Sequence, residues 1–403
     1  MRGLIFWLCI GAVAYHYAGY PLLLFVLSVL VQAKSDFSYL LRRRGRRRFL
    51  KAESVPRVAV LVSIYNEETV IQAKARNCLE IDYPVDRVEF LLGLDAPTDS
   101  TAEALSRTAS DRLRIFHFSS RRGKLSVLRD LACKTSADIL VLTDANSMLE
   151  RNAIRHLVRH FADPSVGAVS GEEIRVAAPG AEPGGEGLYW RYESALKILE
   201  SRMNCSLGGN GAVLAVRRSL FCPREHSIVE DFQIPLEIRF QGHRVVYDPE
   251  AIAVEEIAPT LSAQFGRRVR IGAGNYQTLF AHFEYLNPRR GLLAFSFFSH
   301  RVLRWLAPFL LPVAFVCNMS LAAQPSFAVL FLAQILFYLL AAAGYLRKKR
   351  AGRMGWCSGP FHFCLMNLAL LCGLWRFLRG QQTLAWNPTP RRLENAALLD
   401  KPR

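Results

Sequence analysis

The sequence lacks several patterns that would assign a chain to a common class of protein. Its nine cysteines form no Cys-x-x-Cys pair and no His-Cys cluster at zinc spacing. No disulfide framework is apparent. Cys357, Cys364 and Cys372 fall near one face of a late apolar segment, as expected of packing residues in a reducing compartment. The Gly-rich spacing of a P-loop, an internal repeat and a low-complexity tail are also absent.

Acidic residues are scarce relative to basic ones. The chain has 34 Asp and Glu against 51 Lys and Arg, for a net charge of +17. Much of the excess lies in two short runs, 42–48 and 347–350, and each follows an apolar segment. This placement is typical of an anchor that sets its basic flank on anionic membrane lipid. Nucleic-acid binding is the alternative, but no recognisable module accompanies the runs, so we expect no nucleic-acid partner.

Hydrophobic residues make up 51% of the chain and are concentrated at its two ends. Residues 4–31 are almost continuously apolar, long enough to span a bilayer with a kink at Pro21. A cleaved signal peptide is the alternative, but the segment is too long and its positive charge comes after it. We therefore expect a membrane anchor over 1–33 and a basic linker over 34–55. A catalytic domain on the cytoplasmic face of the inner membrane follows.

The C-terminal region, 287–403, is predicted to combine a surface helix with further membrane spans. Arginines at 289, 290, 301 and 304 favour a helix lying along the cytoplasmic surface over 291–305. Candidate spans follow at 306–317, about 327–345 and about 356–378. Three spans would place Arg391 and Arg392 outside, against the positive-inside rule. Either the last segment is re-entrant or the number of spans differs, and the sequence leaves both open.

Between about 56 and 286 the pattern changes to alternating strands and helices. Predicted strands cover 57–64, 88–94, 113–118 and 138–143, with helices over 66–79, from 99 and over 124–134. This alternation predicts an α/β domain with a mostly parallel sheet. Ligands of such sheets bind at the carboxyl ends of the strands. Polar side chains at Tyr65 and Glu67, at Asp95 and at Asp144 follow three of these predicted strands.

Two acidic clusters carry the chemistry. Asp144 and Asn146 end a strand one residue apart, where a hard cation such as Mg²⁺ or Mn²⁺ binds with help from a diphosphate. Glu230 and Asp231 could supply a base that takes a proton from a hydroxyl. A cation on a diphosphate beside such a base is the arrangement for sugar transfer from a nucleotide donor. The alternatives are that Asn146 caps a helix near residue 150 and that Glu230 and Asp231 complement a helix dipole.

Further residues are candidates for nucleotide binding. Tyr65 and Glu67, at the end of the first predicted strand, are placed for a ribose or base contact, and an ordinary helix N-terminus is the alternative. Asp95, directly after an apolar strand, suits a nucleobase or ribose contact. Lys124 follows Gly123 at a helix start and offers a charge to phosphate, with a solvated basic turn as the alternative. Arg267 and Arg270, at i, i+3 spacing, can grip a diphosphate or form a solvated helix face.

A small-residue turn is a candidate acceptor site. Gly209 and Asn210 lie in the run 208–211 before a predicted strand over 212–216. Small residues there would admit an acceptor close to the backbone. An ordinary tight turn explains the same run.

The order of these motifs resembles the membrane-bound family-2 glycosyltransferases, such as cellulose, hyaluronan and poly-N-acetylglucosamine synthases. The resemblance runs from about 58 to 277 and extends to the segment 386–391. It implies a GT-A fold and inverting transfer from a nucleotide sugar, usually a UDP-sugar, to a growing glycan. By position, Asp95 and Lys124 match nucleotide contacts, Asp144 and Asn146 match the metal-binding Asp-x-Asp, and Asp231 matches the catalytic base.

Two departures from the family pattern bear on function. Asn146 stands where the family has a second Asp. Arg267 and Ile271 stand where the family's Gln-x-x-Arg-Trp has Gln and Trp, while Arg270 is retained. In the family that Trp lines the acceptor site, so its absence bears on the identity of the acceptor and on elongation. We expect transfer to a growing polysaccharide or glycan in cell-surface or exopolysaccharide synthesis, with single-sugar transfer to a lipid acceptor as the first alternative. A non-catalytic membrane assembly subunit is a third hypothesis, and export or assembly subunits are conceivable partners.

Overall fold

The computed structural model describes residues 1–42, 55–108, 110–176, 186–223, 229–257, 260–351 and 354–381. The basic run after Arg42 and the C-terminal segment with Arg391 and Arg392 lie outside these residues. The chain divides into two compact units. One, the sheet unit, comprises 32–181, 200–263 and 383–403; the other, the helical unit, comprises 1–31, 182–199 and 264–382. The predicted catalytic domain, 56–286, thus contributes segments to both units.

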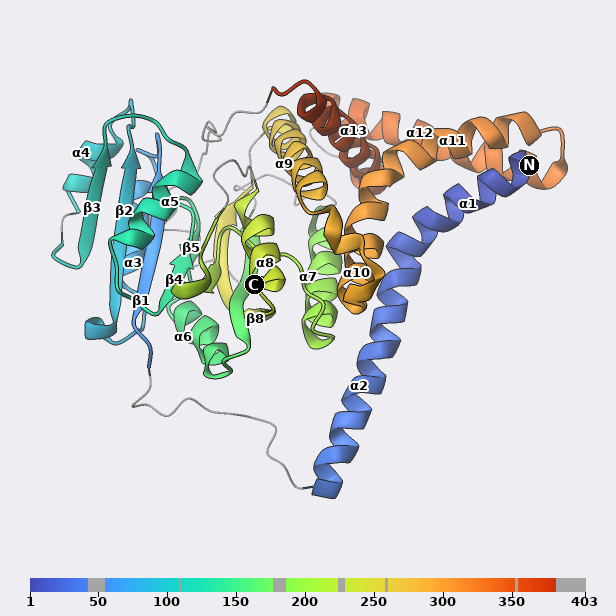
Figure 1. The fold of residues 1–403 in the computed structure, drawn as a ribbon. Coiled ribbons are helices and arrows are strands. Elements are labelled where there is room, and N and C mark those ends of the chain that lie inside the picture. Colours follow the sequence, from blue (N-terminus) through green and yellow to red (C-terminus); the bar gives the residue numbers. More distant parts are fainter. Residues whose placement is uncertain are drawn as a thin grey trace. The chain divides into compact units, whose positions relative to one another are not determined.

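The sheet unit is built on one mixed sheet (Figure 1). Within the described residues its strand order is β3 (Leu113–Phe118), β2 (Val88–Asp95), β1 (Val58–Ile64), β4 (Ile139–Leu142), β7 (Leu214–Arg217), β6 (Val166–Val176), β8 (Arg244–Glu256) and β5 (Met148–Leu149). Strands β3, β2, β1 and β4 are parallel neighbours, as are β6 and β8. Strand β7 is antiparallel to both β4 and β6, and β5 is antiparallel to β8. The predicted mostly parallel α/β sheet is confirmed, with an antiparallel insertion at β7.

Helices cover both faces of this sheet because its central strands are apolar on both sides. Every residue of β1 is buried. Alternate residues such as Val60 pack with α3 (Ile71–Leu79), α4 (Thr101–Ser106) and α6 (Ala153–Val158). Those of opposite parity, such as Leu61, pack with α5 (Lys124–Cys133) and α8 (Glu230–Phe240). The short helices η3 (Val85–Arg87), η4 (Arg159–Ala162) and η5 (Arg218–Leu220) complete the unit.

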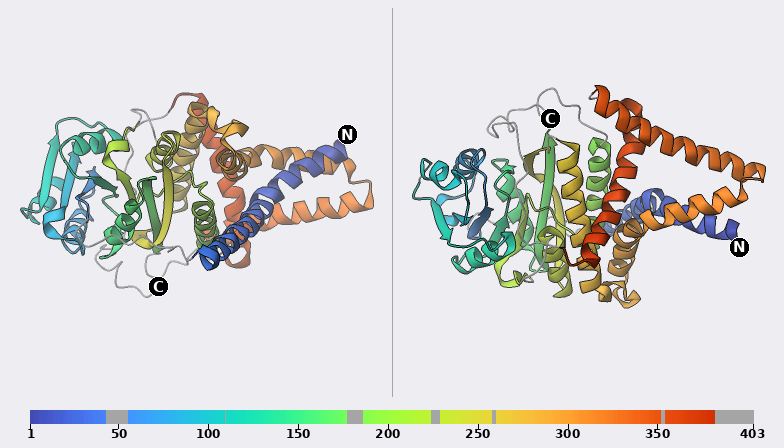
Figure 2. Two further views of the ribbon diagram at one scale, coloured as in Figure 1. Left: turned by 60° about the horizontal axis from the view of Figure 1, so that its bottom comes forward. Right: turned by 90° about the horizontal axis from the view of Figure 1, so that it is seen from above.

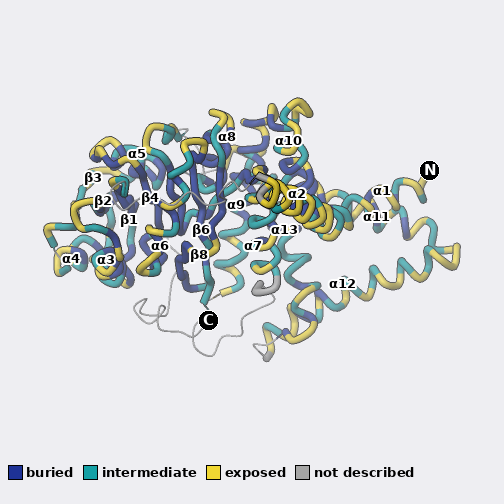
Figure 3. Tube along the Cα trace, turned by 90° about the horizontal axis from the view of Figure 1, so that it is seen from below, coloured by how far each residue is buried: buried dark blue, intermediate teal, exposed yellow. Residues whose placement is uncertain are grey.

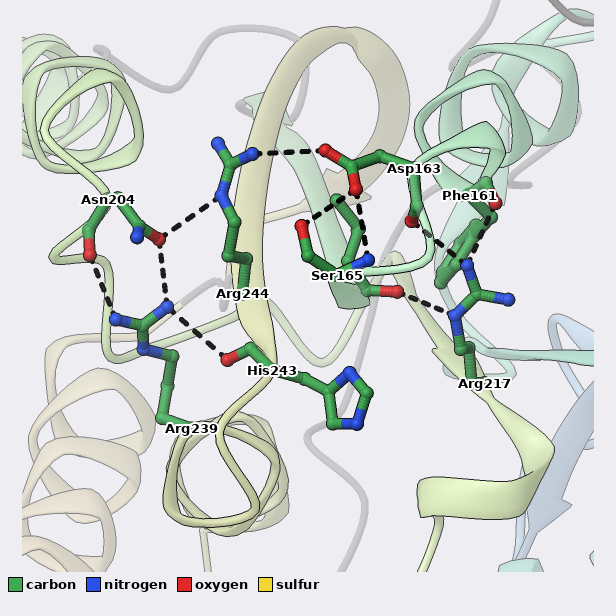
Figure 4. A network of polar contacts seen from close by, with 9 residues as sticks. Phe161, Asp163, Ser165, Asn204, Arg217, Arg239, His243 and Arg244 are labelled. Atoms are coloured by element: carbon green, nitrogen blue, oxygen red, sulfur yellow. Dashed lines mark hydrogen bonds and ion pairs between the residues drawn. The ribbon is translucent and has the colours of Figure 1, made fainter.

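Three arginines fasten one edge of the sheet (Figure 4). Arg217 donates to the carbonyl oxygens of Phe161 at 2.8 Å and Val166 at 2.7 Å. Arg239 and Arg244 both donate to the side-chain oxygen of Asn204, at 2.9 and 3.2 Å. Because Arg217 pairs with Ile139, the first residue of β4, this network lies where β4 begins, at the opposite end from its last residue. The polar side chains that follow β4 therefore lie at the other end of this strand, away from the arginine network.

The helical unit begins with α1 (Arg2–Ala14), η1 (Tyr15–Gly19) and the part of α2 (Tyr20–Arg42) up to residue 31. It also contains α7 (Glu186–Arg202) up to residue 199 and α9 (Leu261–Ala281) from residue 264. Further along the chain are η6 (Phe283–Leu286), η7 (Pro288–Arg290), α10 (Leu292–Ser296), η8 (Phe297–Val302), α11 (Leu303–Leu321), α12 (Pro325–Ala351), η9 (Gly355–Cys357) and α13 (Ser358–Leu378). Helices α11 and α12 form an antiparallel hairpin (Figure 2), and Phe6 of α1 packs edge-on against Phe327 of α12, with ring centroids 5.6 Å apart. Gly373 of α13 lies against the backbone of α9, where a Cβ would come within 2.7 Å of the Ala273 nitrogen.

Four described helical runs are long and apolar enough to cross a membrane: Arg2–Ser38, Leu292–Leu321, Pro325–Arg350 and Gly355–Leu378. Their side chains are more exposed than those of the sheet (Figure 3), and large apolar residues such as Leu8, Val329 and Leu332 are more than 60% exposed. Exposed apolar surface of this kind is expected where lipid is the solvent. The structure therefore supports a membrane protein, with spans close to three of the predicted ones.

The segment 291–305 differs from its prediction as a separate surface helix. It is helical without a break from Leu292 through α11, so the run is a single 30-residue helix. A π-helical turn, η8, lies close to the place where the arginines suggested that the surface helix ends. Near Pro21 the structure likewise has a π-helical turn, η1, in place of a broken helix.

Polar side chains meet inside the helical unit in a group that we name the Glu193 cluster: Tyr189, Glu193, His300 and Arg304. Arg304 Nη1 lies 2.7 Å from Glu193 Oε1, and Tyr189 donates to the same oxygen at 2.8 Å. His300 Nε2 lies 3.5 Å from Glu193 Oε2. Glu193 is buried, so these donors replace the water that it loses on folding. The cluster joins α7 to the helical run that contains η8 and α11.

Candidate active site

The loops after β1 and β2 begin at the same edge of the sheet, because these strands are parallel and in register from Val58 to Ile64. Asn66 has φ 51° and Ala96 has φ 50°, both in the left-handed region. Asn tolerates this conformation, whereas Ala is strained there by about 1 kcal/mol. Such strain persists only where surrounding contacts impose it.

Hydrogen bonds join the two loops. Thr98 N donates to Asn66 Oδ1 at 2.8 Å, and Asn66 Nδ2 donates to Thr98 Oγ1 at 3.0 Å. Glu67 N donates to Thr101 Oγ1 at 2.8 Å, and the Glu67 side chain is buried. The guanidinium of Arg121 lies over the ring of Tyr65, 3.7 Å from its centroid. Tyr65 and Glu67 thus lie in loops at the carboxyl ends of the strands that hydrogen bonds and a ring contact hold in place. Their contacts with a nucleotide stay predictions.

Asp95 organises the start of α5. Its two carboxylate oxygens accept the backbone N–H groups of Arg122 at 2.7 Å and Gly123 at 2.8 Å. Gly123 adopts φ 86°, which a residue with a side chain rarely does, and this turn lets the chain enter the helix at Lys124. Asp95 is buried beneath the turn. It therefore positions Lys124, and its predicted contact with a base or ribose stays untested.

Lys124 reaches two acidic residues from different elements. Its Nζ lies 2.5 Å from Asp144 Oδ1, after β4, and forms a second ion pair with Glu230 Oε1, the first residue of α8. Burial by itself lowers the pKa of Lys124, but the carboxylates of Asp144 and Glu230 raise it well above its usual value. The ammonium group is charged at any physiological pH. We name Lys124, Asp144, Glu230 and Asp231 the carboxylate cluster.

Asp231 completes the cluster in the first turn of α8, where the helix dipole favours negative charge. Its carbonyl oxygen accepts the N–H of Gly209 at 2.8 Å. A Cβ on Gly209 would come within 3.0 Å of that oxygen, so glycine permits the approach. A Cβ on Gly211 would lie 3.6 Å from both Asp231 Cβ and Lys124 Nζ, which places this turn against the cluster. Asn210, also in the turn, is buried and accepts the Ala212 N–H through its side chain at 3.2 Å.

The electrostatics of the cluster act on Asp231. Burial and the neighbouring Glu230 carboxylate raise the pKa of Asp231 to about 6, although Lys124 opposes the shift. A carboxylate with this pKa is ionised at neutral pH and is a stronger base than an exposed Asp. The geometry and the pKa together suit proton removal from a weakly acidic hydroxyl.

Comparison with known proteins decides the family. The model of "Glycosyltransferase like family 2" matches residues 56–274, more than half of the chain. The chain belongs to this family. Its match covers the strand-end loops, the carboxylate cluster and part of α9. A family-2 glycosyltransferase with a GT-A-type fold is what the order of motifs predicted, and that prediction is confirmed.

Similar proteins fall into lipid- and polymer-related groups. The chain is 29% identical over 244 residues to beta-monoglucosyldiacylglycerol synthase of Nostoc sp., covering 56% of this chain and 50% of that one. It is 23% identical over 244 residues to poly-beta-1,6-N-acetyl-D-glucosamine synthase of Staphylococcus aureus, covering 58% of each. The chain thus spans about half the length of the curated relatives it matches.

A solved structure is similar over nearly the whole chain. The mannosyltransferase PcManGT from Pyrobaculum calidifontis, in complex with GDP-Man and Mn²⁺, has a TM-score of 0.67 and 23% identity. The match covers 94% of this chain and 100% of that one. At this identity the likeness establishes the fold. The likeness in fold therefore extends beyond residues 56–274, the part that the family model matches.

The donor set at Asp144 and Asn146 fits a divalent cation of the Mg²⁺ or Mn²⁺ kind. Both side chains present oxygen, and Asp144 is half-buried while Asn146 is buried. No group of three His, Cys, Asp or Glu that could enclose a metal occurs among the described residues. A site with so few protein oxygens suits a cation that takes its other ligands from diphosphate and water.

The structure brings together some predicted site residues of this family-2 glycosyltransferase. Lys124, Asp144 and Glu230 are in direct contact, and Asp231 and Gly209 adjoin them. The two arginines predicted to grip a diphosphate, Arg267 and Arg270, lie on the part of α9 that belongs to the helical unit. Their role stays a prediction.

Sequence reasoning missed one residue near this glycosyltransferase site. Lys74 lies on α3, and its side chain is fully buried beneath the loop that carries Asp144. A signal was present in the sequence. Lys74 falls between Ile71, Ala75 and Cys78 on the apolar stripe of a predicted helix, where a lysine is out of place.

Proposed function

We propose that this family-2 enzyme transfers a sugar, with inversion, from a nucleotide-diphosphate donor to an acceptor hydroxyl at a membrane. The observation that carries the proposal is the carboxylate cluster, which places a base of raised pKa, Asp231, beside Lys124 and Asp144. Asp231 takes the acceptor proton as the sugar–acceptor bond forms and the sugar–diphosphate bond breaks. Glu230 supports Asp231 electrostatically and holds Lys124.

Residues of this chain would stabilise the negative charge of the departing diphosphate. Lys124 is a cation that acts on the base, and Asp144 and Asn146 would hold Mg²⁺ or Mn²⁺, which offsets negative charge on the leaving group. The similar mannosyltransferase structure contains Mn²⁺ and GDP-Man, which supports a divalent cation and a nucleotide sugar here. Tyr65, Glu67, Asp95, Arg267 and Arg270 are assigned to nucleotide binding.

For the acceptor we propose a membrane lipid that receives a single sugar. The Nostoc relative is named for a glucosyl lipid, and Ile271 occupies the position of the Trp that lines the acceptor site in the family. Gly209 and Asn210 adjoin Asp231 and would admit the acceptor. A growing polysaccharide is the second candidate, favoured by the Staphylococcus aureus relative.

We further propose a multi-pass inner-membrane protein whose sheet unit faces the cytoplasm. Four apolar helical runs support the membrane location, and the basic residues that end α12, Lys348, Lys349 and Arg350, support the orientation. Cytoplasmic nucleotide sugars would then reach the site directly. Labelling of single introduced cysteines in intact cells tests this orientation, since an impermeant reagent should miss positions in the sheet unit.

The full chain in lipid nanodiscs, given a panel of UDP- and GDP-sugars with Mn²⁺, provides the decisive test. We expect nucleotide release with one donor and a lipid product that carries one additional sugar by mass spectrometry. A ladder of polymer products would move the assignment to the second candidate. No nucleotide release from any donor, with the protein folded, would favour a non-catalytic assembly subunit and overturn the proposal.

A further inference from the structure

A buried lysine contacts the loop that carries the candidate metal ligands. Lys74 is 0% exposed, and its Nζ donates to Thr143 Oγ1 at 3.1 Å and to the carbonyl oxygen of Ser147 at 2.5 Å. Thr143 precedes Asp144, and Ser147 follows Asn146. The two hydrogen bonds therefore bracket the segment that holds both candidate ligands.

A second side chain of the same helix fastens the loop further on. Asn77 lies one turn after Lys74 and is also buried. Its Nδ2 donates to the carbonyl oxygen of Leu149 at 2.8 Å, and its Oδ1 accepts the Leu149 N–H at 2.9 Å. Helix α3 thus holds the chain from the end of β4 to β5 at two successive points.

The environment of Lys74 is unfavourable for an ammonium group. Its neighbours on α3 pack in the main apolar core, and its contacts with Thr143 and Ser147 are hydrogen bonds to neutral groups, although the Asp144 carboxylate favours its charged form. A buried charge without an ionic partner destabilises a fold, whereas an apolar side chain of similar length fits such a place well. Stability therefore gives no reason for a lysine at this position, but loop placement does.

We infer that Lys74 is a positioning residue that fixes the loop carrying Asp144 and Asn146 for cation binding. The inference rests on the proposed function. With only two candidate ligand side chains, Asp144 and Asn146, cation affinity depends on how well their oxygens are held in place, because a mobile loop must be ordered on binding. Lys74 holds the segment on both sides without contacting the ligands themselves.

The first test replaces Lys74 and measures cation binding without turnover. Lys74→Met keeps length and apolar packing but removes both hydrogen bonds, and Lys134→Met, at an exposed position after α5, is the matched control. Mn²⁺ binding to the full chain in nanodiscs, with UDP present, is followed by electron paramagnetic resonance. We expect the Mn²⁺ dissociation constant of Lys74→Met to rise roughly 10- to 100-fold, with the control unchanged.

A second pair of variants keeps the lysine and so covers a failure of Lys74→Met to fold. Thr143→Val keeps the shape of the side chain but removes the acceptor for Lys74, whereas Thr143→Ser retains the hydroxyl. We expect Thr143→Val to weaken Mn²⁺ binding about tenfold and Thr143→Ser to bind like the parent. Equal weakening by both would assign the effect to packing and overturn the inference.

The outcomes separate the inference from the proposed function. If the parent binds Mn²⁺ with UDP and Lys74→Met or Thr143→Val binds it equally well, the positioning role is wrong whatever the activity. If the parent binds Mn²⁺ but releases nucleotide from no donor, the proposed function fails while the positioning role stands. A parent that does not bind Mn²⁺ overturns the inference, because Lys74 then has no cation site to position.

Discussion

The carboxylate cluster of the sheet unit and the Glu193 cluster of the helical unit are both groups of charged side chains that are partly or wholly buried. In the first, a single ammonium group, Lys124, faces Asp144 and Glu230 directly, with Asp231 beside them. In the second, one carboxylate, Glu193, accepts hydrogen bonds from a guanidinium and a phenol. The two clusters differ in charge balance more than in burial.

This difference has chemical consequences. Burial and the surplus negative charge of the carboxylate cluster raise the pKa of Asp231, and that surplus also leaves room for an added cation; both are useful in group transfer. In the Glu193 cluster, burial raises the pKa of the carboxyl, but His300 and nearby cations outweigh burial and lower the pKa of Glu193 to about 2. A paired carboxylate of this kind joins helices and has little tendency to take up a proton. We therefore expect substitutions in the first cluster to change turnover and those in the second to change stability.

The largest expected effect follows Asp231→Asn. Asn keeps the shape and can still cap α8, but it cannot accept the acceptor proton, so turnover should fall by roughly 10²- to 10⁴-fold. Nucleotide affinity should survive, because Lys124 and Asp144 are intact. Turnover and UDP affinity are measured in one preparation, with exposed Asp86→Asn as the control. Turnover within a few-fold of the parent would move the role of base to Glu230.

A somewhat smaller loss is expected for Asp144→Asn. The change removes one charge of the cluster and one ion pair of Lys124 while keeping an oxygen donor. Activity should fall roughly 100-fold at low Mn²⁺ and recover in part as Mn²⁺ is raised, since the remaining oxygen binds more weakly. A titration of turnover against Mn²⁺ measures this. Full activity of the parent in excess chelator would exclude the cation site.

The positions of some residues of the carboxylate cluster could be predicted from the sequence, whereas their contacts with one another could not. Asp144 was placed correctly because a short apolar strand ends just before it, and Glu230 because acidic residues favour a helix start. The meeting of Lys124 with Glu230 could not be predicted, because the two are 106 positions apart and their approach depends on the antiparallel insertion of β7. Local pattern carries no register for such an insertion.

In the helical unit, periodicity identified apolar runs but misplaced one boundary. Arg301 and Arg304 suggested that a surface helix ends before residue 306, yet the helix continues from Leu292 to Leu321. Arg304 is accommodated there because Glu193, more than 100 positions away, pairs with it. A charge in an apolar helix can be interpreted only when its partner is known.

Glu193→Gln tests the other side of the comparison. Breaking a buried pair by removing one charge leaves Arg304 uncompensated and should destabilise the protein by about 3 kcal/mol. Thermal unfolding in detergent measures the loss, with exposed Glu103→Gln on α4 as the control. Turnover per folded molecule should change little. Loss of turnover at parental stability would show that the Glu193 cluster also takes part in the reaction.

The smallest effect is a shift in the pH profile. Because Asp231 has a pKa of about 6 and acts as a base, kcat/KM should level off above that pH and fall about tenfold per unit below it. Glu230→Gln removes a neighbouring negative charge, so the ionised form of Asp231 is favoured and the acidic limb should move down by roughly one unit. Glu193→Gln should leave the limb in place, because the pKa of Asp231 is shifted chiefly by burial, Glu230 and Lys124. Profiles of the three proteins with saturating Mn²⁺ provide the measurement, and an acidic limb that does not move in Glu230→Gln would show that another group titrates.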